Sequence, residues 1–149
     1  MKDMADPLLD IRDLYVEFPV GGQFLARNRR TLHAVSGVNL SLARGECLSI
    51  VGESGCGKST TALAVMGLQE PTSGDILFRG RSIIGDGAPN RMDRARIAQM
   101  VFQDPYASLN PRQTVRTSLA APLRLHGTTS KSEVDDRIAD ILRKVDLRP

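Results

Sequence analysis

The stretch Gly-Glu-Ser-Gly-Cys-Gly-Lys-Ser at residues 52–59 constrains the fold of this chain more than any other feature. It matches the pattern G-x-x-x-x-G-K-[ST] at every fixed position, with an apolar run before it and an Ala- and Leu-rich run after it. In such a loop, consecutive backbone N–H groups point inward and form a nest for a polyphosphate. A strand, a glycine-rich turn and a helix must therefore follow one another here, which predicts an α/β fold around a phosphate-binding loop.

Each residue type in the loop has a chemical reason to be there. Glycines permit the backbone angles of the loop and leave room for phosphates, and the helix that follows points its N-terminus at the same charge. Lys58 is expected to bridge the β- and γ-phosphates, and the Ser59 hydroxyl is expected to ligate Mg²⁺. The residues expected to contact the nucleotide through this loop are Gly52, Ser54, Gly55, Cys56, Gly57, Lys58, Ser59 and Thr60.

Hydrophobic patterning divides the rest of the chain into short strands and helices. The continuous apolar run 47–51 is typical of a strand buried on both faces. Pro122 is expected to kink or end the helix in which it lies, and Ser130 and Glu133 have the spacing of a capping box before the final helix. Strands are predicted at 8–18, 32–42, 47–51, 75–78, 81–84 and 97–102, and helices at 58–66, 91–96, 114–125 and after residue 130.

Composition places the chain among single globular domains and argues against several functions. It has 149 residues, of which 41% are apolar, and a net charge of +3. No run approaches the roughly 18 apolar residues of a membrane span, and the N-terminus lacks a secretory pattern, so we interpret the chain as cytosolic. The basic cluster Arg27, Arg29 and Arg30 is interpreted as a solvated loop, with attraction to an anionic surface or nucleic acid as the alternative. With four Phe, two Tyr and no Trp, the composition does not favour nucleic acid. Cys47 and Cys56 suggest neither disulfides nor a metal site, and Cys47 is interpreted as a core residue.

The flanking motifs carry a resemblance to a known family. Residues 51–60 closely resemble the Walker A loop of ABC transporter ATPases, and 101–105, Val-Phe-Gln-Asp-Pro, resemble the family's Q-loop, which makes Gln103 the Q-loop glutamine. Residues 103–112 resemble the oligopeptide, dipeptide and nickel importer branch. The resemblance covers residues 8–149 and extends to the segments 34–40, 45–46 and 71–74.

This resemblance implies an ABC-type P-loop NTPase with an N-terminal antiparallel β subdomain, using ATP and Mg²⁺. Lys58 and Gln103 would be catalytic, and Gln103 would also coordinate Mg²⁺. An aromatic ring near the end of the first strand would stack on adenine; Phe18 fits best by position and Tyr15 is the alternative, while simple packing remains open for either. The implied activity is transport-coupled ATP hydrolysis for uptake of short peptides or a related solute. The implied partners are transmembrane permease subunits, a second identical or different ATPase and, indirectly, a solute-binding protein, at the cytoplasmic face of the membrane.

Several parts of the family pattern are not found in this sequence. The signature motif LSGGQ, the Walker B strand and the switch histidine are missing, so residues 1–149 are expected to form a partial nucleotide-binding domain that binds ATP without hydrolysing it efficiently. One alternative is a nucleotide-binding or regulatory fragment without turnover. Another is a DNA-associated ABC ATPase, against which stand the importer-like stretch and the lack of zinc-ligand cysteines.

Overall fold

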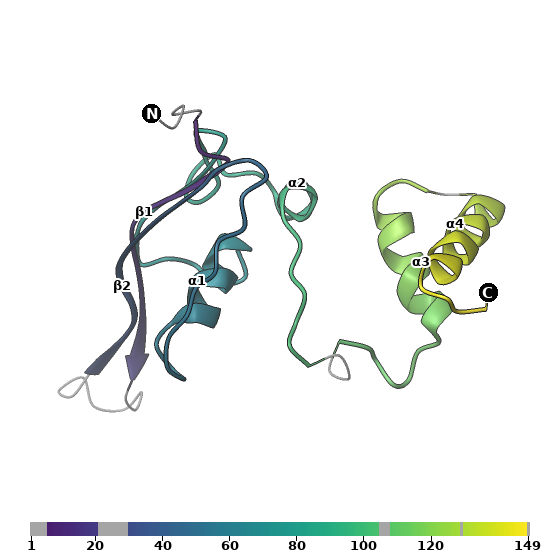
Figure 1. Cartoon of the computed structure of the whole chain (residues 1–149), viewed down its shortest axis with the longest axis horizontal. Coiled ribbons are helices and arrows are strands. Elements are labelled where there is room, and N and C mark those ends of the chain that lie inside the picture. The colour runs from purple at the N-terminus through teal and green to yellow at the C-terminus, as the bar shows by residue number, and fades with distance from the viewer. Residues whose placement is uncertain (1–5, 21–29, 105–107, 129, 149) are drawn as a thin grey trace. The chain divides into compact units, whose positions relative to one another are not determined.

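The computed structural model describes residues 6–20, 30–104, 108–128 and 130–148, and it divides into two compact units, 1–100 and 101–149. The first unit contains β1 (Leu9–Val20), β2 (Arg30–Leu42), α1 (Lys58–Val65), β3 (Ser73–Phe78), β4 (Arg81–Ser82) and α2 (Arg91–Ile97), and the second contains α3 (Val115–Leu125) and α4 (Lys131–Lys144) (Figure 1). Within the described residues, no helix is both long and apolar enough to cross a lipid bilayer.

The strands of the first unit form an antiparallel sheet in the order β2-β1-β3-β4. Strand β1 pairs along its whole length with β2, from Leu9 opposite Leu42 to Val20 opposite Arg30. On its other edge β1 pairs with β3, where Ile11 lies opposite Ile76. The predicted antiparallel β subdomain is therefore confirmed, although the strand expected at 81–84 is limited to Arg81–Ser82.

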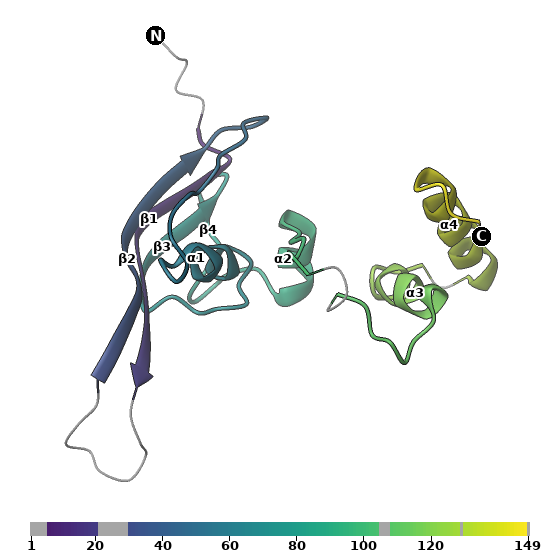
Figure 2. The ribbon, with the colours of Figure 1, turned by 60° about the horizontal axis from the view of Figure 1, so that its bottom comes forward.

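A bulge in β1 allows the core to form on one face of the sheet. In a regular strand Ile11 and Leu14 would point to opposite faces, yet both are buried. The pairing with β2 shifts register between them, and Asp13 takes a φ of 45° in this interval. Helix α1 lies against one face of the sheet (Figure 2). The buried cluster that joins sheet and helix consists of Ile11, Leu14, Val16, Val35, Ala64, Ile76 and Ile83.

The turn that follows α1 lies against Arg94 of α2. The Arg94 guanidinium of α2 donates a hydrogen bond to the carbonyl oxygen of Ile83. The same side chain crosses the turn after α1 so closely that a Cβ on Gly67 would lie 1.7 Å from Arg94 Nη1. Gly67 also has a φ of 65°, so both the space and the backbone angle at this turn require glycine.

Two predicted strands are absent. Neither 47–51 nor 97–102 forms a strand, and Ile97 instead ends α2. Val51 is 89% exposed and Val101 is 95% exposed, and Cys47, which was interpreted as a core residue, is exposed as well. The prediction was wrong because an apolar run becomes a strand only where neighbouring strands pair with its backbone, and the sheet of the described residues offers these segments none.

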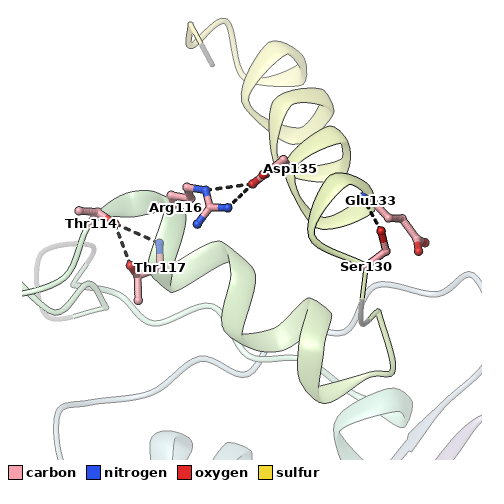
Figure 3. A network of polar contacts seen from close by, with 6 residues as sticks. All are labelled: Thr114, Arg116, Thr117, Ser130, Glu133 and Asp135. Atoms are coloured by element: carbon pink, nitrogen blue, oxygen red, sulfur yellow. Dashed lines mark hydrogen bonds and ion pairs between the residues drawn. The ribbon is translucent and has the colours of Figure 1, made fainter.

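The second unit is a pair of helices with a small core of its own. Ala120 of α3 packs with Val134 and Ile138 of α4. An ion pair between Arg116 and Asp135 joins the two helices at their surface (Figure 3). Pro122 lies inside α3, which continues to Leu125, so the expectation that it could end the helix was wrong.

A side-chain hydrogen bond caps the N-terminus of both α3 and α4. The Thr114 hydroxyl accepts a hydrogen bond from the Thr117 N–H at 3.2 Å, and the Ser130 hydroxyl accepts one from the Glu133 N–H at 3.5 Å (Figure 3). The first half of the predicted capping box is therefore present. Its second half is not, because the Glu133 carboxylate accepts from Arg137 at 2.7 Å, one turn along α4.

The helix pair supplies a stability prediction. Val134→Ala removes methyl groups from a side chain that is 1% exposed. We expect the free energy of opening of α4 to fall by about 2 kcal/mol, because apolar burial is lost and the cavity left behind closes only in part. Arg116→Ala, which breaks the exposed ion pair with Asp135, is the matched control and is expected to cost about 1 kcal/mol or less. Amide hydrogen exchange in α4 measures both. Equal losses in the two variants would contradict the assignment of the core.

Candidate phosphate-binding site

The glycine-rich loop leads directly into α1. The helix begins at Lys58 with Gly57 as its N-cap, in the left-handed region at φ 94° and ψ 0°, and no side chain caps it. Backbone N–H groups at the start of a helix have no partners within the helix, and these unsatisfied donors carry the positive end of the helix dipole. The start of α1 therefore presents donors suited to a bound anion.

The glycines of the loop serve different purposes. A Cβ on Gly57 would lie 2.3 Å from the carbonyl oxygen of Ala34 in β2, so the loop approaches the sheet backbone more closely than any other residue type allows. At Gly52, a Cβ would lie 2.8 Å from Cys56 Sγ, across the turn. Gly55 meets nothing within 4 Å, but its φ of 82° favours glycine. The loop is therefore held in a tight path by contacts with both itself and β2.

The Lys58 side chain folds back over the loop that precedes it. Its Nζ donates hydrogen bonds to the carbonyl oxygens of Gly52 at 2.8 Å and Glu53 at 2.6 Å, and it lies 3.4 Å from Cys56 Sγ. A cationic group is thus positioned beside the N-terminus of α1, inside the loop. Together, the ammonium and the unsatisfied helix donors form a site of concentrated positive charge.

Thr61 is a residue of this site that the sequence analysis missed. It is buried, and both its N–H and its hydroxyl donate to the carbonyl oxygen of Gly57, at 2.8 Å and 3.0 Å. These two bonds fix the junction between loop and helix. Its position four residues after Gly57 was the available signal, because a threonine hydroxyl in a helix can bond to the carbonyl one turn earlier.

The predicted site residues outside the loop occupy different positions. Phe18 is half-buried and packs against the core cluster that contains Ala64 of α1. Tyr15 is 38% exposed and is not part of that cluster; its hydroxyl oxygen lies 3.0 Å from where a Cβ of Gly37 would be. Gln103 belongs to the second unit, where it is exposed. The structure thus brings together the contiguous residues 52–60 in one loop.

The loop contains groups whose chemistry suits the phosphates of a nucleotide. The uncapped start of α1 and the Lys58 ammonium suit phosphate oxygens, and Ser59, exposed in the first turn of α1, provides a hydroxyl of the type that Mg²⁺ accepts. Cys56 is also exposed within the loop. These residues supply donors and charge for binding, and none of them is a carboxylate that could activate water.

Comparisons with known proteins place this loop in a family context. Residues 35–149 match the family described as ABC transporter. The glutathione import ATP-binding protein GsiA of Salmonella paratyphi A is 44% identical over 145 residues, and that of Pectobacterium atrosepticum is 43% identical over 145 residues. Each alignment covers 97% of this chain and 23% of the relative, so the chain spans about a quarter of the length of these curated proteins.

Solved structures give the same result. The chain is similar to cbiO1 of Clostridium perfringens, part of the ABC transporter complex cbiONQ, with a TM-score of 0.66 and 25% identity over 96% of this chain and 52% of that one. It also has the fold of MJ0796, a bacterial ABC transporter cassette solved as a dimer bound to ADP and Pi, with a TM-score of 0.69 and 23% identity over 94% of this chain and 58% of that one. On the family match and these likenesses, the chain belongs to the ABC transporter family.

Proposed function

We propose that this chain binds MgATP through residues 52–60, as part of the ATP-binding subunit of an ABC importer. The observation that carries the proposal is the Lys58 ammonium, held inside a glycine loop at the uncapped start of α1. Binding would transfer the Lys58 hydrogen bonds from two carbonyl oxygens to β- and γ-phosphate oxygens. The donors at the start of α1 would bind the remaining oxygens, and the Ser59 hydroxyl would ligate Mg²⁺.

The adenine base would stack on Phe18 in preference to Tyr15. Phe18 packs with the cluster that includes Val35 of β2 and Ala64 of α1, and Val35 also lies beside Gly57 of the loop. Phe18 therefore packs on the face of the sheet that α1 covers, whereas Tyr15 lies over Gly37. An aromatic ring that is half-buried offers one face to a purine without leaving its packing.

Gln103 would complete the polar environment of the metal. Its exposed amide has an oxygen that can bind Mg²⁺ and an NH₂ group that can orient an attacking water.

The relatives suggest the cargo and the partners. Glutathione is a short peptide, and the relatives named above are described as glutathione import ATP-binding proteins. We infer that the intact transporter takes up short peptides or a related solute, with membrane-spanning permease subunits, a second ATPase subunit and a solute-binding protein. Such an ATP-binding subunit would work at the cytoplasmic face of the membrane.

Binding without turnover is a second candidate for the chain as it stands. Lys58, Ser59 and the loop amides can hold phosphates, but a nucleophilic water also needs a group that orients or deprotonates it. Glu53, the acidic residue of the loop, is exposed and meets Lys58 through its backbone carbonyl. This arrangement favours binding and does not supply a base.

Removal of the loop ammonium tests the binding site. Lys58→Ala is expected to weaken MgATP binding on the order of 10- to 100-fold, since a hydrogen bond to a charged group contributes about 1.5–3 kcal/mol. Lys144→Ala, which removes an exposed lysine at the end of α4, is the control and should leave affinity unchanged. Titration with a fluorescent ATP analogue measures both. Equal affinities for the two variants would refute the role of Lys58.

Thiol labelling tests where the nucleotide lies. Cys56 is exposed beside Lys58 Nζ, so a maleimide should label it, and saturating MgATP should slow that labelling at least tenfold by covering the loop. Cys47 is exposed outside the loop and should label at the same rate with and without MgATP. Variants Cys47→Ser and Cys56→Ser isolate each thiol. Nucleotide-independent labelling of Cys56 would contradict the proposed site.

Phosphate release separates binding from turnover. The purified 149-residue chain should release phosphate far below about 1 s⁻¹, the low end for phosphoryl-transfer enzymes, because its loop contains no positioned base. Lys58→Ala provides the background rate. Turnover near 1 s⁻¹ that disappears in this variant would show that a carboxylate such as Glu53 or Asp104 acts as the base after all.

A further inference from the structure

The part of β1 that carries Phe18 lies beyond the end of β3. Strand β1 lies between β2 and β3 in the sheet, and its pairing with β3 extends from Leu9 to Tyr15. Tyr15 lies opposite Ser73, the first residue of β3. The pairing with β2 continues past this point and places Phe18 opposite Leu32. The proposed adenine platform is therefore paired with β2 on one edge of β1, and β3 does not reach it on the other.

Thr72, the residue before β3, continues the contact with this second edge of β1. Its backbone N–H donates to the carbonyl oxygen of Tyr15 at 2.8 Å, and its Oγ1 accepts from the backbone N–H of Glu17 at 2.9 Å. Pro71 comes before it, and a proline has no backbone N–H with which β3 could continue its ladder. The threonine hydroxyl thus takes the place of the carbonyl oxygen that a longer β3 would offer, at the residue directly before Phe18.

The backbone beside Thr72 is held closely against β1. A Cβ on Gly74 would lie 2.2 Å from the carbonyl oxygen of Asp13, and Gly74 has a φ of 94°, so this approach requires glycine. The segment that contains Thr72 therefore meets β1 at residues 13, 15 and 17. Thr72 itself is exposed and is not part of the buried cluster, so its hydroxyl can be removed without opening the core.

We propose that Thr72 is a positioning residue for the adenine platform, because its hydroxyl fixes the backbone directly before Phe18 and so holds the ring ready for the base. This inference rests on the proposed binding of ATP, with Phe18 as the stacking ring. A ring that is already held in its bound orientation binds a base more tightly, since fewer conformations are lost on binding. Thr72 acts through Glu17 and Phe18 and does not touch the nucleotide, so phosphate binding at Lys58 does not depend on it.

The test compares two ligands of the 149-residue chain by titration calorimetry: MgATP, and magnesium tripolyphosphate, which has phosphates and no base. Thr72→Val replaces the hydroxyl by a methyl group of similar size and should raise the Kd for MgATP about three- to tenfold, the effect of one lost hydrogen bond. Its Kd for tripolyphosphate should change by less than about twofold, which also shows that the loop is folded. Thr72→Ser keeps the acceptor and should restore MgATP binding. Thr31→Val, the same change at an exposed threonine of β2, is the matched control and should bind both ligands normally.

A double-mutant cycle tests whether Thr72 acts through the ring. Phe18→Ala should raise the Kd for MgATP at least as much as Thr72→Val does, and it should leave the Kd for tripolyphosphate unchanged. In the Phe18→Ala background, Thr72→Val should raise the Kd for MgATP by less than about twofold more, because two changes that remove the same interaction are not additive.

Other outcomes would overturn the inference. Equal weakening of both ligands in Thr72→Val would assign Thr72 a general structural role. Unchanged MgATP binding in Thr72→Val, failure of Thr72→Ser to restore binding, or full additivity with Phe18→Ala would each overturn it while leaving the proposed nucleotide site intact. Unchanged MgATP binding in Phe18→Ala would overturn both the adenine platform and this inference, so the two failures are distinguishable.

Discussion

Gly57 lies so close to β2 that a Cβ there would come within 2.3 Å of the carbonyl oxygen of Ala34. This approach of two backbones determines where α1 begins, because Gly57 is also the N-cap of that helix. The start of α1 in turn determines the direction of Lys58 and the aim of the unsatisfied helix donors. Thr61 strengthens the same junction with two bonds to the Gly57 carbonyl. The charge of the site is thus positioned by the antiparallel sheet.

The sheet can position the loop because no residue of its buried core cluster lies in the loop. The cluster around Leu14 and Val16 joins three strands and α1, and the bulge at Asp13 keeps Ile11 and Leu14 on the same face. The loop, in contrast, is exposed from Gly52 to Cys56. A rigid sheet carrying an exposed loop is a common arrangement for binding sites, since the loop needs open access and the sheet supplies its position.

Local features of this fold could be predicted from sequence, and features that depend on distant partners could not. The loop from Gly52 to Ser59, the helix after it and the Ser130 cap follow from short spacings whose chemistry is complete within a few residues. The apolar run 47–51 is typical of a strand, but a strand forms only beside neighbouring strands, and no local pattern shows whether these are present. The proposal of Phe18 over Tyr15 likewise rests on the three-dimensional placement of β1, because bulges break the simple alternation of its faces.

The contacts around α1 involve segments that lie both before and after the helix in the chain. Helix α1 is positioned at its start by β2, which precedes it, and the turn at its end lies against Arg94 of α2, which follows it. A ribosome releases the loop well before it releases α2, so during synthesis α1 first rests on the sheet with its C-terminal turn unrestrained. β3, which pairs with β1, also emerges after the loop. The elements that position the anion site, β2 and the loop, therefore precede in the chain the elements that complete the packing around α1.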